Sequence, residues 1–303
     1  MPNVSLAERA ALVALLRVRP EGLTWGEIAT QVVEAGSAVA VWERSVPATL
    51  TGVPGQLGPL ESAAADVTAW TDRGWTVLVI MDQDYPARLR GIHQAPPVLF
   101  ALGTVICDDP AVSVVGSRRA SERGRSIAAS VARELTRRGL TVVSGLALGI
   151  DAAAHRAALD AGGRTVAVIG TGISRAYPAE NRGLQEEIAV GGLLLSQFWP
   201  DAPPQQRNFP MRNATMSGYG LATIVVEAGE HSGARIQARL AVEHGRPVIL
   251  TSDVVERNAW AQALATRPGV AVAGSLRAVM ASVDHVVAER EAVGDALARL
   301  VAP

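Results

Sequence analysis

Cysteine is nearly absent from the sequence, and lysine is absent altogether. Cys107 is the single cysteine among 303 residues, which excludes a disulfide framework and a metal site built from several cysteines. No apolar run approaches the roughly 18–20 residues that a membrane-spanning helix needs. The first residues carry no basic stretch followed by an apolar core, so we expect no secretory signal, no membrane segment and a cytoplasmic location.

The sequence also lacks an excess of positive or negative charge. The 28 basic residues, all of them arginine, and the 29 acidic residues give a net charge of −1. This balance argues against a protein that coats nucleic acid with an overall positive surface. It allows a local anion site, because a phosphate responds mainly to nearby charges and amides. Residues 111–140 are such a local exception, since seven arginines against two glutamates give this region a charge of +5.

Apolar residues, in contrast, are abundant. Hydrophobic residues make up 49% of the chain and charged residues 19%, which provides enough material for a packed core and excludes wholesale disorder. A length of 303 residues suggests one large α/β unit with a smaller partner domain.

The N-terminal region has the pattern of a small helical domain. Ser5 and Thr24 stand where helix N-caps belong, each is followed by apolar residues at helical spacing, and Gly36 is a stop signal. Residues 51–60 contain three glycines and two prolines, which predicts a linker. We therefore expect the first domain to end near residue 63.

Beyond this point, strand-like and helix-like segments alternate. The expected strands are short and apolar, and they cover residues 76–80, 96–100, 112–115, 141–144, 165–169, 192–196, 222–226, 247–250 and 270–272. The expected helices cover residues 62–73, 122–138, 151–161, 180–190, 207–218, 232–245 and 275–282, with a last helix over 289–299. Nearly continuous Val, Ile and Leu predicts a parallel sheet with helices on both faces, whose ligands bind at the carboxyl ends of the strands.

The turn after the strand at 112–115 has the composition of an anion site. Gly116 lets the chain turn, Ser117 and Ser121 offer hydroxyls, and Arg118 and Arg119 add positive charge beside the free amides of the next helix. Phosphate binding is the functional interpretation. A capped helix with a solvated basic face is the structural alternative.

Two further glycine turns follow the next two strands. Gly145 and Gly149 lie in the first, where Asp151 stands at an N-cap position and His155 follows on the same helix face. Acid–base chemistry by this pair is less expected than a cap with a packed histidine. The segment 170–172, Gly-Thr-Gly, forms the second turn. Because successive parallel strands end at one edge of the sheet, we expect all three turns to converge on one site.

Two later segments complete this candidate site. Phe209 is one of only three phenylalanines and lies in a polar, proline-rich stretch, where it could be a buried anchor or an exposed platform for a stacked base. Ser232 and Gly233 open a helix after the strand at 222–226, and they make another amide-rich anion cradle.

In their order and spacing, these motifs resemble the DprA/Smf family of DNA-processing proteins. The resemblance spans residues from about 76 to 250, more than half of the chain. The segments that carry it are Asp84-Tyr-Pro, Pro96-Pro-Val-Leu-Phe, Gly116-Ser-Arg, residues 144–155, Gly170-Thr-Gly, residues 177–181, residues 208–213 and Ser232-Gly.

The resemblance implies an α/β protein with an extended Rossmann-like fold and a mostly parallel sheet, preceded by a small N-terminal helical domain of the SAM or helix-hairpin-helix type. The expected domains are residues 1–63, residues 64–288 and a C-terminal helix or tail over residues 289–303. It further implies binding of single-stranded DNA, a homodimer, and loading of a RecA-type recombinase during natural transformation. No catalytic residue, cofactor or metal is implied.

The residues that we expect to contact DNA or its phosphates are glycines, hydroxyl-bearing residues, arginines, one asparagine and one aromatic. They are Gly116, Ser117, Arg118, Arg119, Ser121, Gly145, Gly149, Gly170, Thr171, Gly172, Arg207, Phe209, Arg212, Asn213, Ser232 and Gly233. The resemblance places Gly116, Ser117 and Arg118 on the DNA phosphates, and Phe209 and Arg212 along the groove.

The sequence also departs from the family pattern. Residues 252–303 do not supply the winged-helix domain that many members carry. Thr251-Ser-Asp replaces the usual Pro-Gly turn, Ala214-Thr-Met differs from the usual continuation of the Arg-Asn motif, and His231 stands where lysine is common. These differences concern the strength of DNA binding and the loading of the recombinase, not the fold.

Two other functions remain open at this point. A nucleotide phosphoribohydrolase of the LOG type shares this kind of scaffold, and Asp151, Glu180 or Glu227 would then be its acids, although the Pro-Gly-Gly-x-Gly-Thr signature of those enzymes is absent. A regulatory or interaction module that keeps the fold without the DNA groove is the other alternative.

Overall fold

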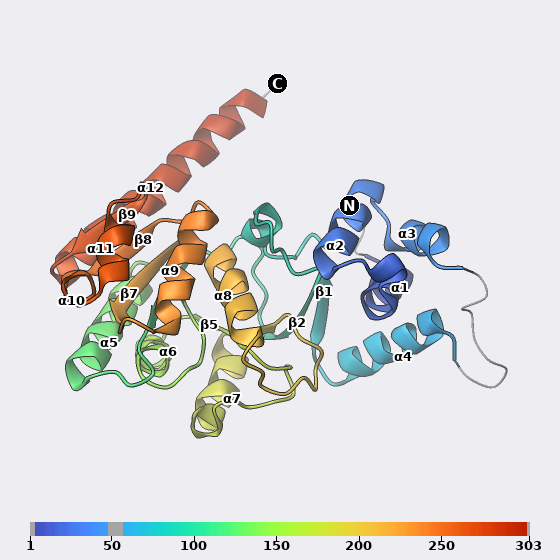
Figure 1. Ribbon diagram of the computed structural model, residues 1–303, viewed down its shortest axis with the longest axis horizontal. Helices are drawn as coiled ribbons and strands as arrows, with labels where there is room; N and C mark the ends of the chain where they lie inside the picture. The colour runs from blue at the N-terminus through green and yellow to red at the C-terminus, as the bar shows by residue number, and fades with distance from the viewer. Residues whose placement is uncertain (1–3, 48–56, 302–303) are drawn as a thin grey trace.

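The N-terminal part of the chain is helical. The computed structural model describes residues 4–47 and 57–301, and it begins with helices α1 (Leu6–Val18), α2 (Trp25–Ala35), α3 (Ala38–Ser45) and α4 (Pro59–Asp72), with a short turn η1 (Pro20–Gly22) (Figure 1). The Ser5 hydroxyl accepts the Glu8 amide, Thr24 forms a capping box with Glu27, and Gly36 ends α2 in the left-handed conformation. The predicted helix signals at Ser5, Thr24 and Gly36 are therefore confirmed.

The end of this helical part differs from the sequence-based expectation. A boundary near residue 63 falls inside α4, which packs on α1, since Ala63, Val67 and Trp70 share one buried cluster with Leu12 and Leu16. The predicted linker over 51–60 lies mostly outside the described residues, and α4 already begins at Pro59. A first domain that ends at residue 63 would therefore divide a packed helix, and the three-part division of the chain stays a prediction.

The larger part of the chain is built on one sheet of nine strands in the described residues. These are β1 (Thr76–Val79), β2 (Val98–Gly103), β3 (Ala111–Gly116), β4 (Thr141–Ser144), β5 (Thr165–Val168), β6 (Leu193–Ser196), β7 (Ala222–Glu227), β8 (Val248–Thr251) and β9 (Val270–Ala273). The spatial order is β1-β2-β6-β5-β4-β3-β7-β8-β9. β2 pairs antiparallel with both β1 and β6, whereas every other neighbouring pair in this order is parallel. The predicted extended Rossmann-like fold is confirmed.

Helices cover both faces of the sheet. They are α5 (Glu122–Arg137), α6 (Ile150–Asp160), α7 (Arg182–Gly191), α8 (Asn208–Tyr219), α9 (Gly233–Glu243), α10 (Ser252–Arg257), α11 (Ala259–Ala265) and α12 (Leu276–Val301), with short turns η3 (Ala87–Gly91) and η4 (Ala179–Asn181). Buried residues of α5, α6 and α12 pack on one face of β3, β4 and β7, whereas buried residues of α8, α9 and α11 pack on the other.

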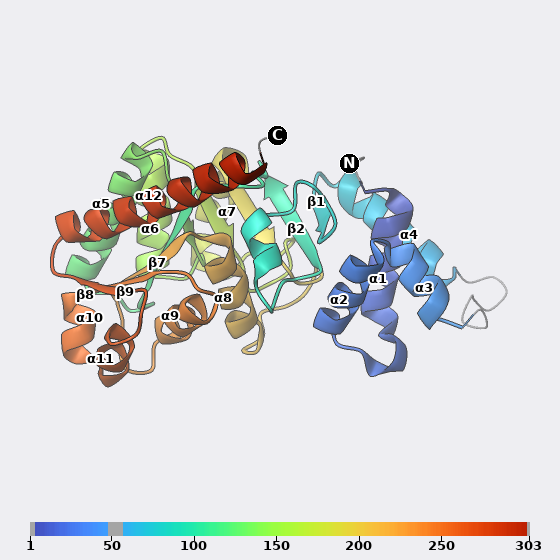
Figure 2. The same ribbon diagram turned by 90° about the horizontal axis from the view of Figure 1, so that it is seen from above.

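The C-terminal region departs most from the expected elements. α10 and α11 were not among the predicted helices. The helices expected over 275–282 and 289–299 fall in one continuous helix, α12, which begins at Leu276. Figure 2 shows α12 from above, and Figure 1 shows that it starts beside the sheet domain and that its C-terminal half extends away from it. The described part of the expected tail, residues 289–301, continues this helix, whose first half packs on the sheet domain through Val279, Met280 and Val283.

None of the helices in residues 4–47 and 57–301 combines the length and the apolar character that crossing a membrane requires. Over the same residues, no group of three or more His, Cys, Asp or Glu side chains is arranged to hold a metal ion.

Candidate functional site

The strand order reverses between β3 and β7. From β3 the chain proceeds through β4, β5 and β6 on one side of the sheet, and it then returns to β7 on the other side. Such a switch point is where open α/β sheets bind ligands, beyond the carboxyl ends of the strands. The turns after β3, β4 and β5, which the sequence predicts to converge, therefore lie on the same edge as the loop after β7.

A groove of about 900 Å³ lies at this edge. The turn at 115–119, the residues 147 and 151 after β4, the start of α8 and the loop 229–234 line it, and we call it the central groove. A smaller cavity of about 100 Å³, the side pocket, adjoins it between Arg118, Gly170, Tyr177 and Phe209. Four loops that lie far apart in sequence thus build one continuous concave surface.

An arginine and two aromatic rings form the most exposed part of this surface. The Arg118 guanidinium carbon lies 5.0 Å from the centre of the Phe209 ring. The Tyr177 ring centre lies 5.9 Å from that of Phe209, and Tyr177 is 40% exposed. The Phe209 ring also lies against Gly170, where an added Cβ would be 2.9 Å from its Cδ1 and Cε1 atoms. We call Phe209 and Tyr177 the aromatic platform.

Arg212 lies beneath this platform and is almost fully buried. Its Nη1 donates to the Val168 carbonyl at 2.7 Å and its Nε to Asn213 Oδ1 at 3.1 Å. The guanidinium sits directly on Gly145, where any side chain would collide with it. Burial lowers the pKa of Arg212 to about 10, and the Asp151 carboxylate counteracts this shift. Arg212 remains charged at neutral pH and lines both the central groove and the side pocket.

Asp151 and His155 do not form an acid–base pair. Asp151 does not cap α6 as expected, since Gly149 is the N-cap residue. The Asp151 carboxylate instead accepts a hydrogen bond from the Gly145 amide at 3.1 Å. Burial raises the pKa of Asp151, whereas Arg212 acts in the opposite direction. The fully buried His155 contacts Thr165 Oγ1 at 2.7 Å through Nδ1, and burial lowers its pKa to about 3. Asp151 braces the turn, and His155 is a neutral core residue.

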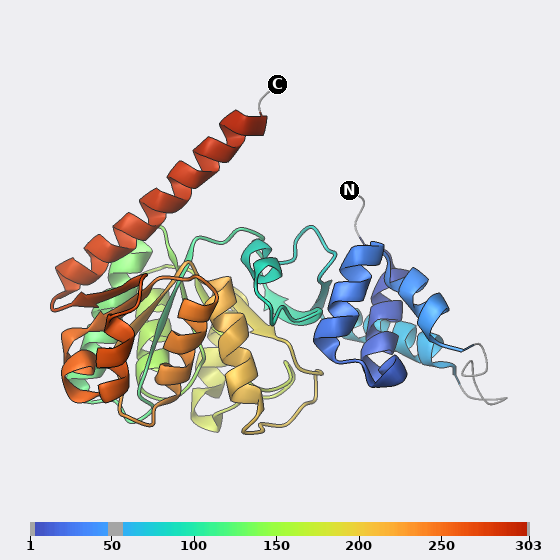
Figure 3. The same ribbon diagram turned by 45° about the horizontal axis from the view of Figure 1, so that its top comes forward.

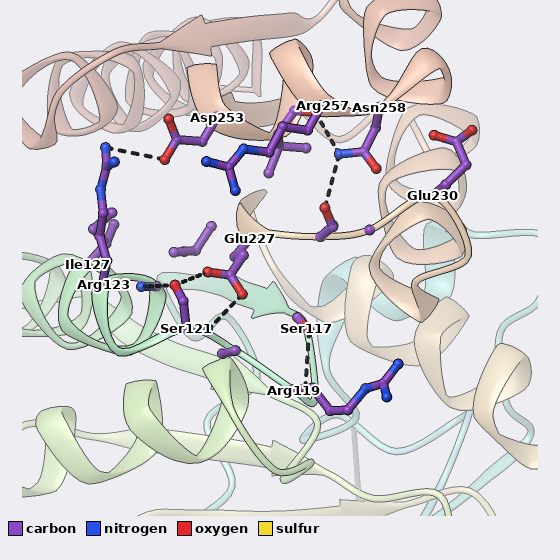
Figure 4. A pocket seen from close by; sticks show the side chains of 16 residues that line it. Ser117, Arg119, Ser121, Arg123, Ile127, Glu227, Glu230, Asp253, Arg257 and Asn258 are labelled. Carbon is purple, nitrogen blue, oxygen red and sulfur yellow. Dashed lines mark hydrogen bonds and ion pairs between the residues drawn. The ribbon is translucent and has the colours of Figure 1, made fainter.

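The start of α5 is occupied by a carboxylate of the protein itself. The Glu227 carboxylate, at the end of β7, accepts the Ser121 amide at 2.9 Å and the Ser121 hydroxyl (Figure 4). Ser121 Oγ also accepts the Gly124 amide at 2.9 Å as the helix cap. The Ser117 amide donates to the Glu227 carbonyl at 2.7 Å. Ser121 therefore does not offer the free phosphate cradle that its sequence position predicts.

We expect Glu227→Gln to lower the free energy of unfolding by about 1 kcal/mol, because the amide keeps the shape but removes a negative charge from a helix N-terminus. Urea unfolding would measure the loss. Glu186→Gln, at an exposed position of α7, is the matched control and should change the stability much less. Equal stability of the two variants would contradict a capping role for Glu227.

The basic character of residues 111–140 is largely cancelled in the fold. Four of the seven arginines form ion pairs: Arg123 with Asp253, Arg125 with Glu122, and Arg137 and Arg138 with Glu134. Within the described residues, Arg118, Arg119 and Arg133 make no ion pair, and only the first two line the central groove. The net positive charge is therefore concentrated at the turn after β3.

Several other predicted contact residues serve mainly to hold the loops. Thr171 is 1% exposed and its carbonyl accepts Ser196 Oγ, while Gly172 is buried and its amide donates to Ala202. Asn213 is 7% exposed and faces the Gly233 carbonyl. Because Gly116 and Gly149 have no side chain, the turns after β3 and β4 can lie close to the residues packed against them. Thr171 and Gly172 are thus buried in this structure, and their contact with DNA stays a prediction.

The remaining predicted residues lie where a ligand could reach them. Ser232 caps α9 and lines the central groove with Gly233, and Ser117 and Arg119 line the opposite wall. Arg207 is exposed just before α8, and its Nε donates to Gln205 at 2.8 Å. The structure adds Tyr177, which the sequence-based set omitted although an exposed aromatic beside a glycine turn was a usable signal.

A second cavity of about 690 Å³ lies on the other side of Glu227. α10, which was not predicted, supplies Asp253 and Arg257 to its wall (Figure 4). Three arginines and three acids line it: Arg119, Arg123, Arg257, Glu227, Glu230 and Asp253. Because these charges balance, this cavity lacks the positive character of the turn after β3.

Comparison with known proteins gives consistent matches. The model of the family described as DNA recombination-mediator protein A matches residues 76–275. Protein Smf of Synechocystis is 42% identical over 172 residues, 55% of this chain and 43% of that protein. DNA processing protein DprA of Bacillus subtilis is 38% identical over 184 residues, 60% of this chain and 62% of that protein. The chain thus spans about half the length of these curated relatives.

A solved structure extends the likeness over nearly the whole fold. The X-ray structure of DNA processing protein A from Streptococcus pneumoniae superposes with a TM-score of 0.70 at 31% sequence identity. The superposition covers 92% of this chain and 98% of the solved chain. The superposition therefore includes helical residues that precede residue 76, where the family match begins, as well as the sheet domain.

Proposed function

The chain belongs to the DNA recombination-mediator protein A family of DNA-processing proteins, and from this premise we propose that it binds single-stranded DNA along the central groove without sequence preference. Arg118 and Arg119 would contact phosphates, and the aromatic platform would stack a base. No catalytic step is proposed.

One observation carries this proposal: an exposed arginine lies on an aromatic ring that is itself partly exposed. Arg118 is free of ion pairs in the described residues, and Phe209 and Tyr177 stand next to it. Single-stranded DNA presents phosphates and unpaired bases together, and proteins bind it by combining cations with aromatic faces. Buried Arg212 adds a second fixed positive charge below the platform.

We also propose that the protein protects single strands, acts as a homodimer and loads a RecA-type recombinase during natural transformation. These finer roles rest on the family resemblance and on the names of its relatives. A nucleotide hydrolase is not favoured, because Asp151 and Glu227, two of its candidate acids, are both engaged by backbone amides.

Arg118→Ala should weaken binding to a labelled oligo-dT about tenfold at low salt, because an arginine–phosphate contact is a charge-assisted hydrogen bond. The slope of log K against log salt should decrease by about 0.7, the value for one phosphate on a single strand. A fluorescence anisotropy titration at several salt concentrations would measure both.

Arg133→Ala provides the control for this titration. Arg133 is also exposed, lies on α5 and forms no ion pair in the described residues, but it does not line the central groove. Its removal should leave the affinity unchanged. Absence of binding by the wild-type protein at low salt, or equal affinity for double-stranded DNA, would refute the proposed function.

A further inference from the structure

A cluster of aromatic side chains joins the N-terminal helices to the segment between β6 and α8. Trp199, in that segment, lies 5.2 Å from Trp25 and 6.1 Å from Trp70 between ring centres, and 6.1 Å from Phe100. Trp25 belongs to α2, Trp70 to α4 and Phe100 to β2. Figure 3 shows this segment extending from the sheet domain toward the N-terminal helices.

Arg17 of α1 completes the cluster. Its guanidinium carbon lies 5.2 Å from the Trp199 ring centre and 5.6 Å from that of Trp70. Asp66 on α4 holds the same guanidinium through an ion pair of 2.7 Å. Three helices of the N-terminal part therefore contact one tryptophan ring, which has little freedom to move independently of them.

The backbone that follows Trp199 holds the turn after β5. The Pro200 carbonyl accepts both the Ser174 amide at 3.0 Å and the Ser174 hydroxyl at 2.8 Å. The Ala202 carbonyl accepts the Gly172 amide at 2.9 Å. A displacement of Trp199 would thus be transmitted to residues 172–174 through three hydrogen bonds.

The turn after β5 in turn supports the aromatic platform. The Phe209 ring rests on Gly170, and Asn208 Nδ2 donates to the Gly170 carbonyl at 3.2 Å. Tyr177 follows three residues after Ser174 on the same loop. One segment, residues 199–209, therefore contacts the N-terminal helices at its start and carries Phe209 at its end.

We propose that Trp199 is a positioning residue through which the N-terminal helices set the aromatic platform. Neither Trp199 nor these helices needs to contact DNA for this role. The proposal rests on the proposed function for its consequence, namely base stacking, but the mechanical linkage can be tested without DNA.

Arg17→Ala tests the linkage by amide hydrogen exchange. Arg17 is 34% exposed, so its removal should loosen the packing on Trp199 without opening the core. The Gly172 and Ser174 amides should then exchange about tenfold faster. The Ser117 amide, which donates to Glu227 at the other side of the groove, should keep its rate.

Arg73→Ala is the matched control, because Arg73 also stacks on a tryptophan, Trp75, at 5.5 Å, but outside the cluster around Trp199. Wild-type exchange rates at Gly172 and Ser174 in Arg17→Ala would overturn the proposal. Equal acceleration in Arg73→Ala would also overturn it, since the effect would then be a general loosening.

Trp199→Ala tests the consequence for binding. The wild-type protein should prefer an oligo-dT strand over an abasic strand of equal length by about tenfold, since only the former offers bases to stack. In Trp199→Ala this preference should fall to about twofold, while the salt slope and the affinity for the abasic strand stay unchanged. Trp199→Phe, which keeps an aromatic ring, should restore most of the preference.

The outcomes separate the two proposals. Equal weakening on both strands, or an undiminished preference for oligo-dT, would overturn the positioning role. If the wild-type protein binds neither strand, the proposed function fails, and the exchange rates of Arg17→Ala alone decide whether the linkage exists. The same exchange measurement decides it if Trp199→Ala does not fold.

Discussion

Phe209→Ala lowers the affinity for single-stranded DNA by about ten- to a hundredfold and leaves the salt slope nearly unchanged: this is the result we expect from an anisotropy titration with oligo-dT. Stacking of a base on an aromatic side chain contributes about 1–3 kcal/mol, and tenfold in affinity corresponds to about 1.4 kcal/mol. The charge of Arg118 does not depend on the ring, so the number of counterions displaced by the phosphate contacts that we propose for it should stay the same.

Met211→Ala is the control for this substitution. Met211 lies on the same helix, two residues further, and is 46% exposed, but it lines neither the central groove nor the side pocket. Phe209→Trp should retain binding because it offers a larger stacking face. A loss of affinity in Phe209→Ala no larger than in Met211→Ala would show that the strand does not pass over the platform.

Arg9→Ala should destabilise the protein by about 3–5 kcal/mol. Arg9 on α1 binds both carboxylate oxygens of Asp82, with Nη2 to Oδ1 at 2.7 Å. Asp82 follows β1, is 1% exposed and also accepts the Val79 amide at 2.8 Å. Removing the arginine leaves a buried carboxylate without its counter-charge, which is among the most costly single changes in a protein.

Chemical denaturation would measure this loss, and the exposed Arg44 on α3 offers a control substitution to alanine with an expected effect below about 0.5 kcal/mol. The double variant Arg9→Ala, Asp82→Ala should be less destabilised than the sum of the two single variants, because the unpaired charge is then gone. A loss below about 1 kcal/mol in Arg9→Ala would indicate that water or another group compensates Asp82.

The sheet could be predicted from the sequence because its strands are almost purely aliphatic. Segments such as 141–144 and 165–168 carry no charged residue, and their only polar residues are hydroxyl-bearing ones at the ends. Glycine turns begin within two residues of each. The convergence of these turns follows from the parallel pairing alone. The family motifs then assign Arg118 and Phe209 to one surface. In the structure, the Arg118 guanidinium carbon lies 5.0 Å from the centre of the Phe209 ring.

Two of the misses share one physical cause: contacts between residues far apart in sequence. Nothing near Ser121 indicates that Glu227, 106 residues later, neutralises the helix start. Likewise, nothing near Arg123 indicates that Asp253 forms an ion pair with it and neutralises its positive charge. The continuity of α12 has a local cause instead: buried Val283 and partly buried Val286 and Val287 continue the apolar stripe between the two expected segments.

The pairing of β3 with β7 also determines when the groove can exist during synthesis of the chain. One wall follows β3 and the other follows β7, and Ser121 and Glu227, which join them, are 106 positions apart. A nascent chain that has emerged only through β6 can pair β3 with β4 and β4 with β5, but it has no second wall. Closing such a long loop is entropically costly and slow. The central groove can therefore be completed only after β7 has been synthesised.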